Sequence, residues 1–470
     1  MDSAHGPSNQ EPTPQGVTTQ THQVRVAEVP ASEAFTWHTR PGAMLRLTPA
    51  ALASVVAEPE PGLAVGTHAR LRVGPGPGIG WVAEHTERWS DPDTGRYGFV
   101  DEQLRGPFRR WQHRHLISEA DPSGAVIRDE VSWALPRLAG PGRGITAHQV
   151  ERMLQYRARQ VVADLTWQQQ HPGPRLSIAV TGAGGLVGRQ LVAFLSSQGH
   201  RVRALRRGSD WDPDQDWVAR GVLDEVDVVV HLAGEPIGRR FTAAHKERIL
   251  TSRTRSTALL ARTLADLSAD GRERSLVCAS AMGWYGADTG DVVLDEDRPS
   301  GHDFLAEVCR AWEQAAEPAR AAGLRTVHVR TGIVQSAAGG QLALQLPLFR
   351  AGVGGPLGSG RQWMSWIALD DLVGLYALAV VDPSLSGPVN AAAPEPVRAD
   401  EYAAVLAKVL SRPHALRVPP LGPRLLLGRE GAEQLALADN RLSSARAESW
   451  GHRFRFPDLD AALRHELCVV

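Results

Sequence analysis

The feature that most limits how this chain can fold is a glycine-rich segment between an apolar run and an amphipathic run. Residues 177–180 (SIAV) are the apolar run, residues 181–188 (TGAGGLVG) are the glycine-rich segment, and residues 190–198 have helical spacing. A second strand-like run begins at Val202. A strand, a tight glycine turn, a helix and a second strand in this order form one unit of a parallel sheet. We therefore expect a doubly wound α/β fold of the Rossmann type in this part of the chain.

Three of the four glycines in this segment have a predicted role. Gly182 permits the tight turn, Gly185 lets the backbone approach a pyrophosphate, and Gly188 lets the helix pack closely against the strand. The helix that follows presents its free N-terminal N–H groups to the phosphates, and Leu186 and Val187 of the turn are also predicted to contact the cofactor. The segment is therefore predicted to bind a dinucleotide cofactor, with an ordinary glycine-rich loop as the alternative.

The end of the second strand distinguishes between the two nicotinamide cofactors. Enzymes that use NAD usually carry an acidic residue about 20 positions beyond the glycines, where it accepts a hydrogen bond from the ribose. Arg206 and Arg207 stand there instead. A guanidinium group pairs bidentately with a phosphate, so this pair favours NADP(H). The alternative is a solvated pair of arginines on a loop.

The next buried strand is predicted over residues 227–234 (DVVVHLAG). It ends in small residues, which let a cofactor lie across the carboxyl edge of the sheet, where ligands of open α/β folds bind. Leu232, Ala233 and Gly234 are therefore predicted to contact the cofactor.

Composition and pattern divide the chain into four predicted parts. Residues 1–22 are polar and predict a disordered tail. Residues 23–170 predict antiparallel strands (23–29, 68–73, 96–104, 109–117 and 125–133) followed by one long helix over about 147–165. Residues 176–415 alternate buried strands with amphipathic helices, which predicts a parallel sheet, and residues 416–470 predict a small helical domain.

The N-terminal part resembles the START-like, helix-grip class, in which a sheet wraps a long helix around an apolar cavity. The stretches that carry this resemblance are residues 40–43 (RPGA), 46–49 (RLTP), 99–108 (FVDEQLRGPF) and 129–131 (DEV). The resemblance implies an α+β domain that binds an apolar small molecule or serves as an unliganded scaffold.

The C-terminal part resembles the epimerase-like branch of the extended short-chain dehydrogenases, often labelled nucleoside-diphosphate-sugar epimerases. The matching stretches include residues 232–237 (LAGEPI), 252–253 (SR), 303–309 (DFLAEVC), 330–334 (RTGIV), 354–367 (GGPLGSGRQWMSWI) and 387–390 (GPVN). The resemblance implies a small-molecule substrate and cofactor contacts at Arg206, Arg207, Leu232, Ala233 and Arg253. For Arg253 the alternative is a surface ion-pair partner.

The catalytic residues depart from the family pattern. Ser280 lies at the end of a predicted strand, where the family places its serine, and Tyr285 matches a tyrosine that usually lines the site. The family's Tyr-x-x-x-Lys pair, whose tyrosine is the general acid and base, is missing, because residues 304–310 read FLAEVCR. Three interpretations stay open: Ser280 and Tyr285 catalyse, Asp303 or Glu307 substitutes, or the domain binds the cofactor without turnover as a sensor or scaffold.

Charge and composition give no support for a nucleic-acid-binding, membrane-bound or disulfide-rich protein. The chain has 51 Lys and Arg against 52 Asp and Glu, which gives no argument for a nucleic-acid or membrane partner. Its three cysteines are too few for a disulfide framework, and no signal peptide or membrane span is recognised, so a cytoplasmic location is expected. His113 and His115 share one face of a predicted strand, but two histidines without a third ligand seldom bind a metal, so no metal site is predicted.

Overall fold

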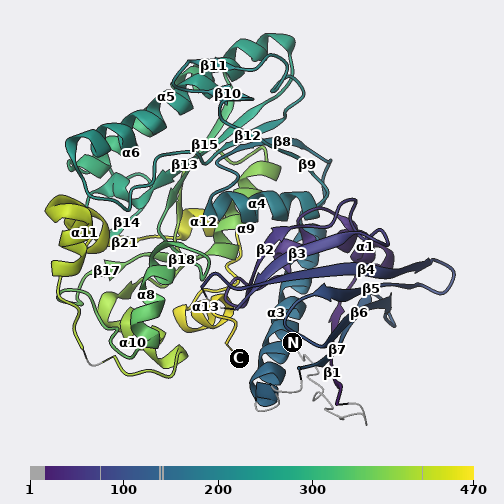
Figure 1. The fold of residues 1–470 in the computed structure, drawn as a ribbon. Helices are drawn as coiled ribbons and strands as arrows, with labels where there is room; N and C mark the ends of the chain where they lie inside the picture. The colour runs from purple at the N-terminus through teal and green to yellow at the C-terminus, as the bar shows by residue number, and fades with distance from the viewer. Residues whose placement is uncertain (1–15, 75, 137–138, 140–141, 415, 470) are drawn as a thin grey trace. The chain divides into compact units, whose positions relative to one another are not determined.

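The structure is a computed structural model that describes residues 16–74, 76–136, 139, 142–414 and 416–469 (Figure 1). The chain divides into two compact units. The first contains Met1–Pro174, Ala193–Gly199 and Leu467–Val470, and the second contains Arg175–Val192 and His200–Glu466. Most of the predicted tail lies outside the described residues. Its last part does not, because the first strand already begins at Thr18.

The first unit contains an antiparallel sheet with the strand order β1-β7-β6-β5-β4-β3-β2. The strands are β1 (Thr18–Val26), β2 (Ala53–Ala57), β3 (His68–Val73), β4 (Ile79–Asp91), β5 (Arg96–Arg105), β6 (Arg110–Glu119) and β7 (Ala125–Ala134). The helices are α1 (Ala31–Thr39), α2 (Ala43–Arg46) and α3 (Arg143–Gln170). The predicted strands correspond to β1, β3, β5, β6 and β7, and the predicted long helix is α3. Strands β2 and β4 were not predicted.

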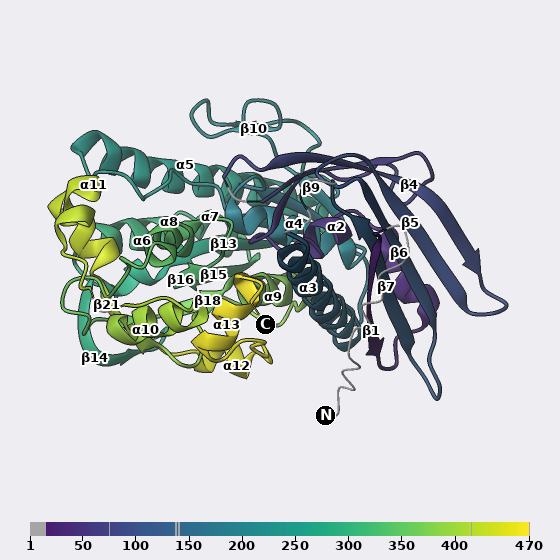
Figure 2. The same cartoon turned by 60° about the horizontal axis from the view of Figure 1, so that its bottom comes forward.

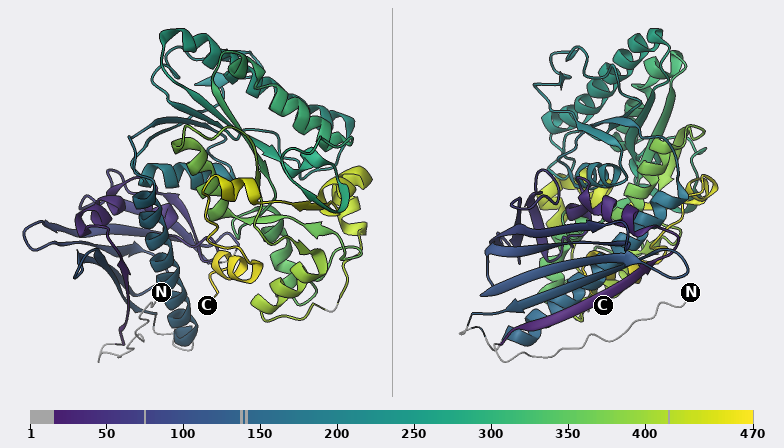
Figure 3. Two further views of the ribbon diagram at one scale, coloured as in Figure 1. Left: turned by 180° about the vertical axis from the view of Figure 1, so that it is seen from behind. Right: turned by 90° about the vertical axis from the view of Figure 1, so that its right-hand side faces the viewer.

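The long helix α3 packs on the sheet beside β1 and β7 (Figure 2; Figure 3 gives two further views). Val150 and Leu154 of α3 belong to one buried apolar cluster with Trp133 of β7. The Gln20 side chain joins the three elements: its Nε2 donates to Ala147 O at 3.0 Å, and its Oε1 accepts from Trp133 Nε1 at 3.0 Å. The burial of apolar side chains and the two hydrogen bonds of the buried Gln20 side chain thus hold α3 against the sheet.

The second unit is built on a parallel sheet with the order β19-β15-β13-β12-β8-β9. These strands are β8 (Ser177–Thr181), β9 (Arg201–Ala204), β12 (Val228–His231), β13 (Ser275–Ala281), β15 (Arg325–Thr331) and β19 (Gly387–Ala391). After β8 the chain goes first to β9 on one side and then to β12 on the other. The strand order therefore changes direction at β8. Open α/β sheets bind ligands at such a point, at the carboxyl ends of the two strands, which here are β8 and β12.

Helices lie on both faces of this sheet, as predicted (Figures 1 and 2). On one face lie α5 (Ala243–Leu267), α6 (Phe304–Gln314) and α7 (Glu317–Ala321), and on the other lies α9 (Leu369–Val381). Leu260 and Leu264 of α5 are fully buried with Leu276 of β13. The helix that follows the glycine turn, α4 (Leu186–Ser197), begins four residues earlier than the predicted residue 190, directly after Gly185.

The second unit contains further helices and strands outside this sheet. They are β10 (Trp211–Asp212), β11 (Trp217–Val218), β14 (Asp288–Leu294), β16 (Ile333–Gln335), α8 (Gly340–Arg350), β17 (Trp363–Met364), β18 (Trp366–Ala368), β20 (Val397–Arg398), α10 (Ala399–Val409), α11 (Leu421–Gly431), β21 (Asp439–Leu442), α12 (Ala445–Ser449) and α13 (Leu459–Glu466). The predicted C-terminal helical region therefore also contains a strand, β21, which pairs in parallel with β14. In the described part of the chain, no helix combines the length and the apolar character needed to cross a membrane.

Candidate functional site

The glycine turn between β8 and α4 has the geometry that its sequence predicts. Gly182 has φ +68°, a left-handed conformation that favours glycine, and a Cβ there would lie 2.7 Å from Leu232 C. A Cβ at Gly188 would lie 2.2 Å from Gly182 O. The turn is therefore closed on both sides by backbone, which keeps the start of α4 against the end of β8. The predicted approach of Gly185 to a pyrophosphate stays a prediction.

Two glycines of this turn form a matched pair for mutation. We expect Gly188→Ala to lower the free energy of unfolding by about 1–3 kcal/mol, because its Cβ must displace backbone atoms, and to weaken cofactor binding. Gly184→Ala is the control, since a Cβ at Gly184 meets no atom within 4 Å. Urea unfolding of both variants measures the difference. Equal stability of the two variants would contradict the tight packing assigned to Gly188.

A series of buried side-chain hydrogen bonds fixes the end of β12 beside this turn. His231 Nδ1 lies 2.7 Å from Thr181 Oγ1, and His231 Nε2 lies 2.8 Å from Ser256 Oγ on α5. Burial lowers the pKa of His231 to about 3, so its ring is neutral at pH 7. Thr181 Oγ1 also accepts from Leu232 N at 3.2 Å. The predicted contact residues Leu232 and Ala233 are thus held at the carboxyl edge, next to the glycine turn.

Arg253 lies under the loop that follows β12. Its Nη1 donates to Glu235 O at 3.0 Å and to Ile249 O at 3.1 Å, and its guanidinium lies over the Trp312 ring at 5.0 Å. A Cβ at Gly234 would lie 3.2 Å from the Arg253 guanidinium carbon. Arg253 therefore supports the predicted cofactor-contact segment rather than forming a surface ion pair. Its direct contact with a cofactor stays a prediction.

Arg206 and Arg207 follow β9, and both are exposed. The backbone N–H of Arg206 donates to Asp210 Oδ2 at 2.7 Å, which shapes the loop. Arg207 forms an ion pair with Asp214, and its Nε lies 3.8 Å from Asp212 Oδ1. The side chains of Arg207 and Asp214 are 55% and 59% exposed, so this pair contributes little to stability and is readily exchanged for another anion.

Ser280, a predicted catalytic residue, lies at the end of β13 and is buried. Its Oγ donates to Glu313 Oε1 of α6 at 2.7 Å. The same carboxylate accepts from Nε and Nη2 of Arg330 on β15, each at 2.9 Å. Arg330 also stacks on Trp284 at 3.8 Å. The Ser280 hydroxyl is therefore part of a buried, bidentate ion-pair network.

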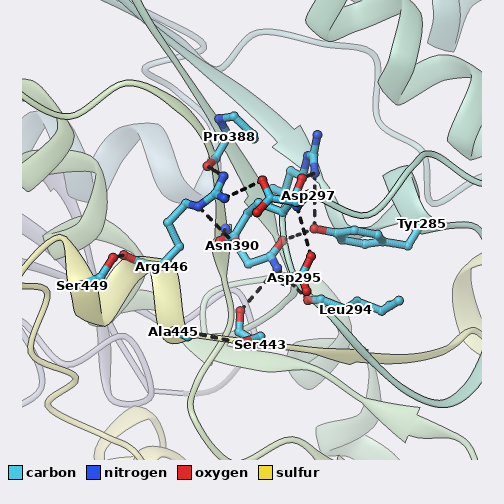
Figure 4. A network of polar contacts seen from close by, with 12 residues as sticks. Tyr285, Leu294, Asp295, Asp297, Pro388, Asn390, Ser443, Ala445, Arg446 and Ser449 are labelled. Carbon is cyan, nitrogen blue, oxygen red and sulfur yellow. Dashed lines mark hydrogen bonds and ion pairs between the residues drawn. The ribbon is translucent and has the colours of Figure 1, made fainter.

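Tyr285, the second predicted catalytic residue, is linked to the same network through Arg330. Figure 4 shows Tyr285 beside Asn390. Its hydroxyl donates to Asn390 Oδ1 of β19 at 2.7 Å and accepts from Arg330 Nη1 at 3.3 Å. Burial raises the pKa of Tyr285 to about 12, although Arg330 acts in the opposite direction. Arg330 thus links the two predicted residues, and both hydroxyls are already hydrogen-bonded to protein groups. Their catalytic roles stay a prediction.

The start of α6, where the family's tyrosine and lysine would lie, contains two acidic residues with different positions. Asp303 is the N-cap: its Oδ1 accepts from Ala306 N at 2.9 Å, and its Oδ2 accepts from Ala287 N at 2.7 Å. Glu307 is exposed in the first turn of the helix. Asp303 is therefore occupied by backbone donors, which leaves it poorly suited to replace the missing acid and base.

Comparison with known proteins places this site in a family. A model described as the NAD dependent epimerase/dehydratase family matches residues 178–391. The Arabidopsis thaliana protein named "Epimerase family protein SDR39U1 homolog, chloroplastic" is 40% identical over 304 residues, which cover 62% of this chain and 86% of that protein. The chain belongs to the epimerase family. A second model, described as a domain of unknown function (DUF1731), matches residues 418–466 of this epimerase-family protein.

Two solved structures are similar to this epimerase-family protein. The nucleoside-diphosphate sugar epimerase from Corynebacterium glutamicum has 36% sequence identity and a TM-score of 0.78, and the match covers 95% of this chain and 90% of that one. The human epimerase family protein SDR39U1 (isoform 2) with NADPH has 28% identity and a TM-score of 0.55, covering 62% of this chain and 99% of that one. The first similarity extends over both units, whereas the START-like assignment of the N-terminal unit stays a prediction.

Sequence reasoning did not give a role to the charged core of the network. Arg330 and Asn390 lie in stretches that were named only for the family resemblance, and Glu313 was given no role. Their pairing depends on three segments far apart in the chain, so no local pattern reveals it.

Proposed function

We propose that this epimerase-family protein binds NADP(H) and acts as an oxidoreductase or epimerase on a small carbonyl or hydroxyl substrate. The observation that carries the proposal is the exposed Arg206–Arg207 pair after β9, beside the backbone-lined glycine turn. NADP(H), when bound, supplies or accepts a hydride. The chain's own groups would bind and orient it: the α4 N-terminus would hold the pyrophosphate, and Arg206 and Arg207 would hold the 2′-phosphate.

The cofactor preference is supported by the contacts of Arg207. Its present partner, Asp214, is exposed and lies seven residues away on the same loop, so a phosphate can displace it at little cost. The human relative with NADPH supports the same choice. The end of the second strand is the basis of this preference, because Arg206 and Arg207 stand where NAD-binding enzymes usually carry an acidic residue.

A second candidate function is a cofactor-binding protein without turnover. Two observations favour it: the family's Tyr-x-x-x-Lys pair is absent, and the Tyr285 hydroxyl, with its pKa raised to about 12, is bonded to Asn390. An acid and base in this chemistry works best when its pKa lies near the operating pH. Under this candidate the protein reports the nicotinamide state or supports an assembly.

Turnover assays separate the two candidates. We expect wild-type protein to oxidise NADPH with at least one member of a panel of sugar nucleotides, quinones and aldehydes, and Ser280→Ala and Tyr285→Phe to lower that rate about 100-fold or more. Tyr402→Phe is the matched control, because it removes another buried hydroxyl that donates to an amide oxygen, that of Gln335, at 2.8 Å. NADPH absorbance measures the rate. No turnover with any compound supports the non-catalytic candidate. Equal rates in Tyr285→Phe and Tyr402→Phe would show that Tyr285 has no catalytic role.

We further propose that the N-terminal unit is a START-like domain that takes an apolar small molecule. The antiparallel sheet packed on the long helix α3 supports this class. Native mass spectrometry of protein purified from its own host tests it: a bound apolar molecule supports the proposal, and a unit without ligand supports the scaffold alternative.

A further inference from the structure

His113 and His115, set aside as a metal site on sequence grounds, have a third candidate ligand in the structure. In the antiparallel register, Asp101 of β5 lies opposite His113 of β6, and Asp129 of β7 lies opposite His115. Side chains at opposite positions of adjacent strands lie on the same face and within reach of one another. The sheet therefore brings two imidazoles and two carboxylates together on one face. We propose that Asp101, His113 and His115 bind a first-row divalent metal ion, with Zn²⁺ as the ion to test.

The distances fit a small metal site. Asp101 Oδ2 lies 3.2 Å from His115 Nε2 and 3.9 Å from His113 Nδ1. One ligand atom from each of the three residues lies within 4.8 Å of the other two. Tetrahedral zinc with bonds of about 2.1 Å places its ligand atoms roughly 3.4 Å apart. Small side-chain rotations therefore complete the geometry.

The second ring nitrogen of each histidine, the one that would not bind the metal, lies near the Asp129 carboxylate. Asp129 Oδ1 lies 2.6 Å from His115 Nδ1 and 3.3 Å from His113 Nε2. Metal-binding histidines usually donate their second ring N–H to a carboxylate, which fixes the tautomer and the ring orientation. Arg157 of α3 donates from Nε to Asp129 Oδ2 at 3.1 Å and balances its charge. Asp129 is thus placed as the supporting carboxylate and Asp101 as the ligand.

The surroundings hold the ligands rigid and leave a route to the solvent. The Phe99 ring stacks on His115 with centroids 4.0 Å apart. Both histidine side chains are buried, whereas that of Asp101 stays 19% exposed. Two nitrogens and one carboxylate oxygen suit zinc and related transition-metal ions, and three protein ligands leave a position for water or an oxygen-bearing ligand. The alternative is a hydrogen-bonded cluster without metal, in which a doubly protonated His115 ring donates from Nε2 to Asp101 and from Nδ1 to Asp129.

Calorimetric titration of the untagged, chelator-treated full chain with ZnCl₂ tests the proposal. We expect one ion per chain, an affinity about 100-fold lower or weaker still in Asp101→Ala and His113→Ala, and one about 10–100-fold lower in Asp129→Asn. His68→Ala is the control, because His68 is an exposed histidine on β3 of the same sheet, and its affinity should equal that of the wild type. Circular dichroism of each variant establishes that it is folded.

A second measurement needs no variant. Co²⁺ bound to the wild-type chain should give the intense visible absorption of a four-coordinate ion with nitrogen and oxygen ligands, and ZnCl₂ should abolish it. Absence of Zn²⁺ binding, equal binding by folded Asp101→Ala and His113→Ala, or only the weak spectrum of hydrated Co²⁺ would overturn the proposal in favour of the hydrogen-bonded cluster without metal.

Discussion

Replacing Arg206 and Arg207 together by alanine should lower the affinity for NADPH about 100-fold or more, since each hydrogen bond to a charged group contributes about 1.5–3 kcal/mol. The affinity for NADH should change less than about threefold, because NADH lacks the 2′-phosphate that we propose the guanidinium groups contact. Both arginines are exposed, so the fold tolerates their removal. Isothermal titration calorimetry with each cofactor measures the two affinities.

A control for this variant lies on the same strand. Arg201 of β9 is exposed and forms an ion pair with Glu225 at 3.4 Å, at the opposite end of the strand from the proposed phosphate site. Arg201→Ala removes one positive charge and should leave the preference for NADPH intact. If Arg201→Ala and the double variant weaken NADPH binding equally, general charge attraction rather than a phosphate site explains the preference.

Glu313→Gln should lower the free energy of unfolding by about 3–5 kcal/mol, because it leaves the buried Arg330 guanidinium without its carboxylate. The side chains of Arg330 and Glu313 are only 3% and 9% exposed. The Ser280 hydroxyl loses its charged acceptor in the same variant. Urea unfolding followed by circular dichroism measures the change.

The control for Glu313→Gln is Glu317→Gln, three residues beyond the end of α6. Glu317 pairs with Arg320 at 2.7 Å, but both side chains are exposed, so its loss should cost less than about 1 kcal/mol. Similar effects of the two variants would show that the Glu313–Arg330 pair is not a major part of the core. A large loss of stability in Glu313→Gln alone would show that the ion pair to which Ser280 and Tyr285 are hydrogen-bonded stabilises the fold.

Local patterns predicted the cofactor-binding part of the molecule well. The glycine turn and the helix after it depend on consecutive residues, and Gly182 has the positive φ expected of it. The strand β4 was missed for a physical reason: its register with β5 shifts between Val82 and Ala83 and again between His85 and Glu87. Such bulges break the alternation by which a strand is recognised in a sequence. The short strand β2 has a similar irregularity opposite β3.

Long-range contacts were beyond the reach of sequence patterns. Asp101 becomes a candidate ligand only once β5 and β6 are paired in register. The helix α9 gives a smaller example. Asp370 and Asp371 stand in the first turn of α9, which begins at Leu369. Asp370 contacts His465 at 2.8 Å, and Asp371 accepts from Arg455 N at 2.7 Å. Both carboxylates therefore bind residues 455–465, which are distant from α9 in the sequence.

The most direct test of the account is the binding of NADPH and NADH to the unmodified chain, measured by isothermal titration calorimetry in one buffer. The exposed arginine pair beside the glycine turn predicts that NADPH binds at least about tenfold more tightly than NADH, a difference of about 1.4 kcal/mol. Equal affinities, tighter binding of NADH or binding of neither cofactor would contradict it.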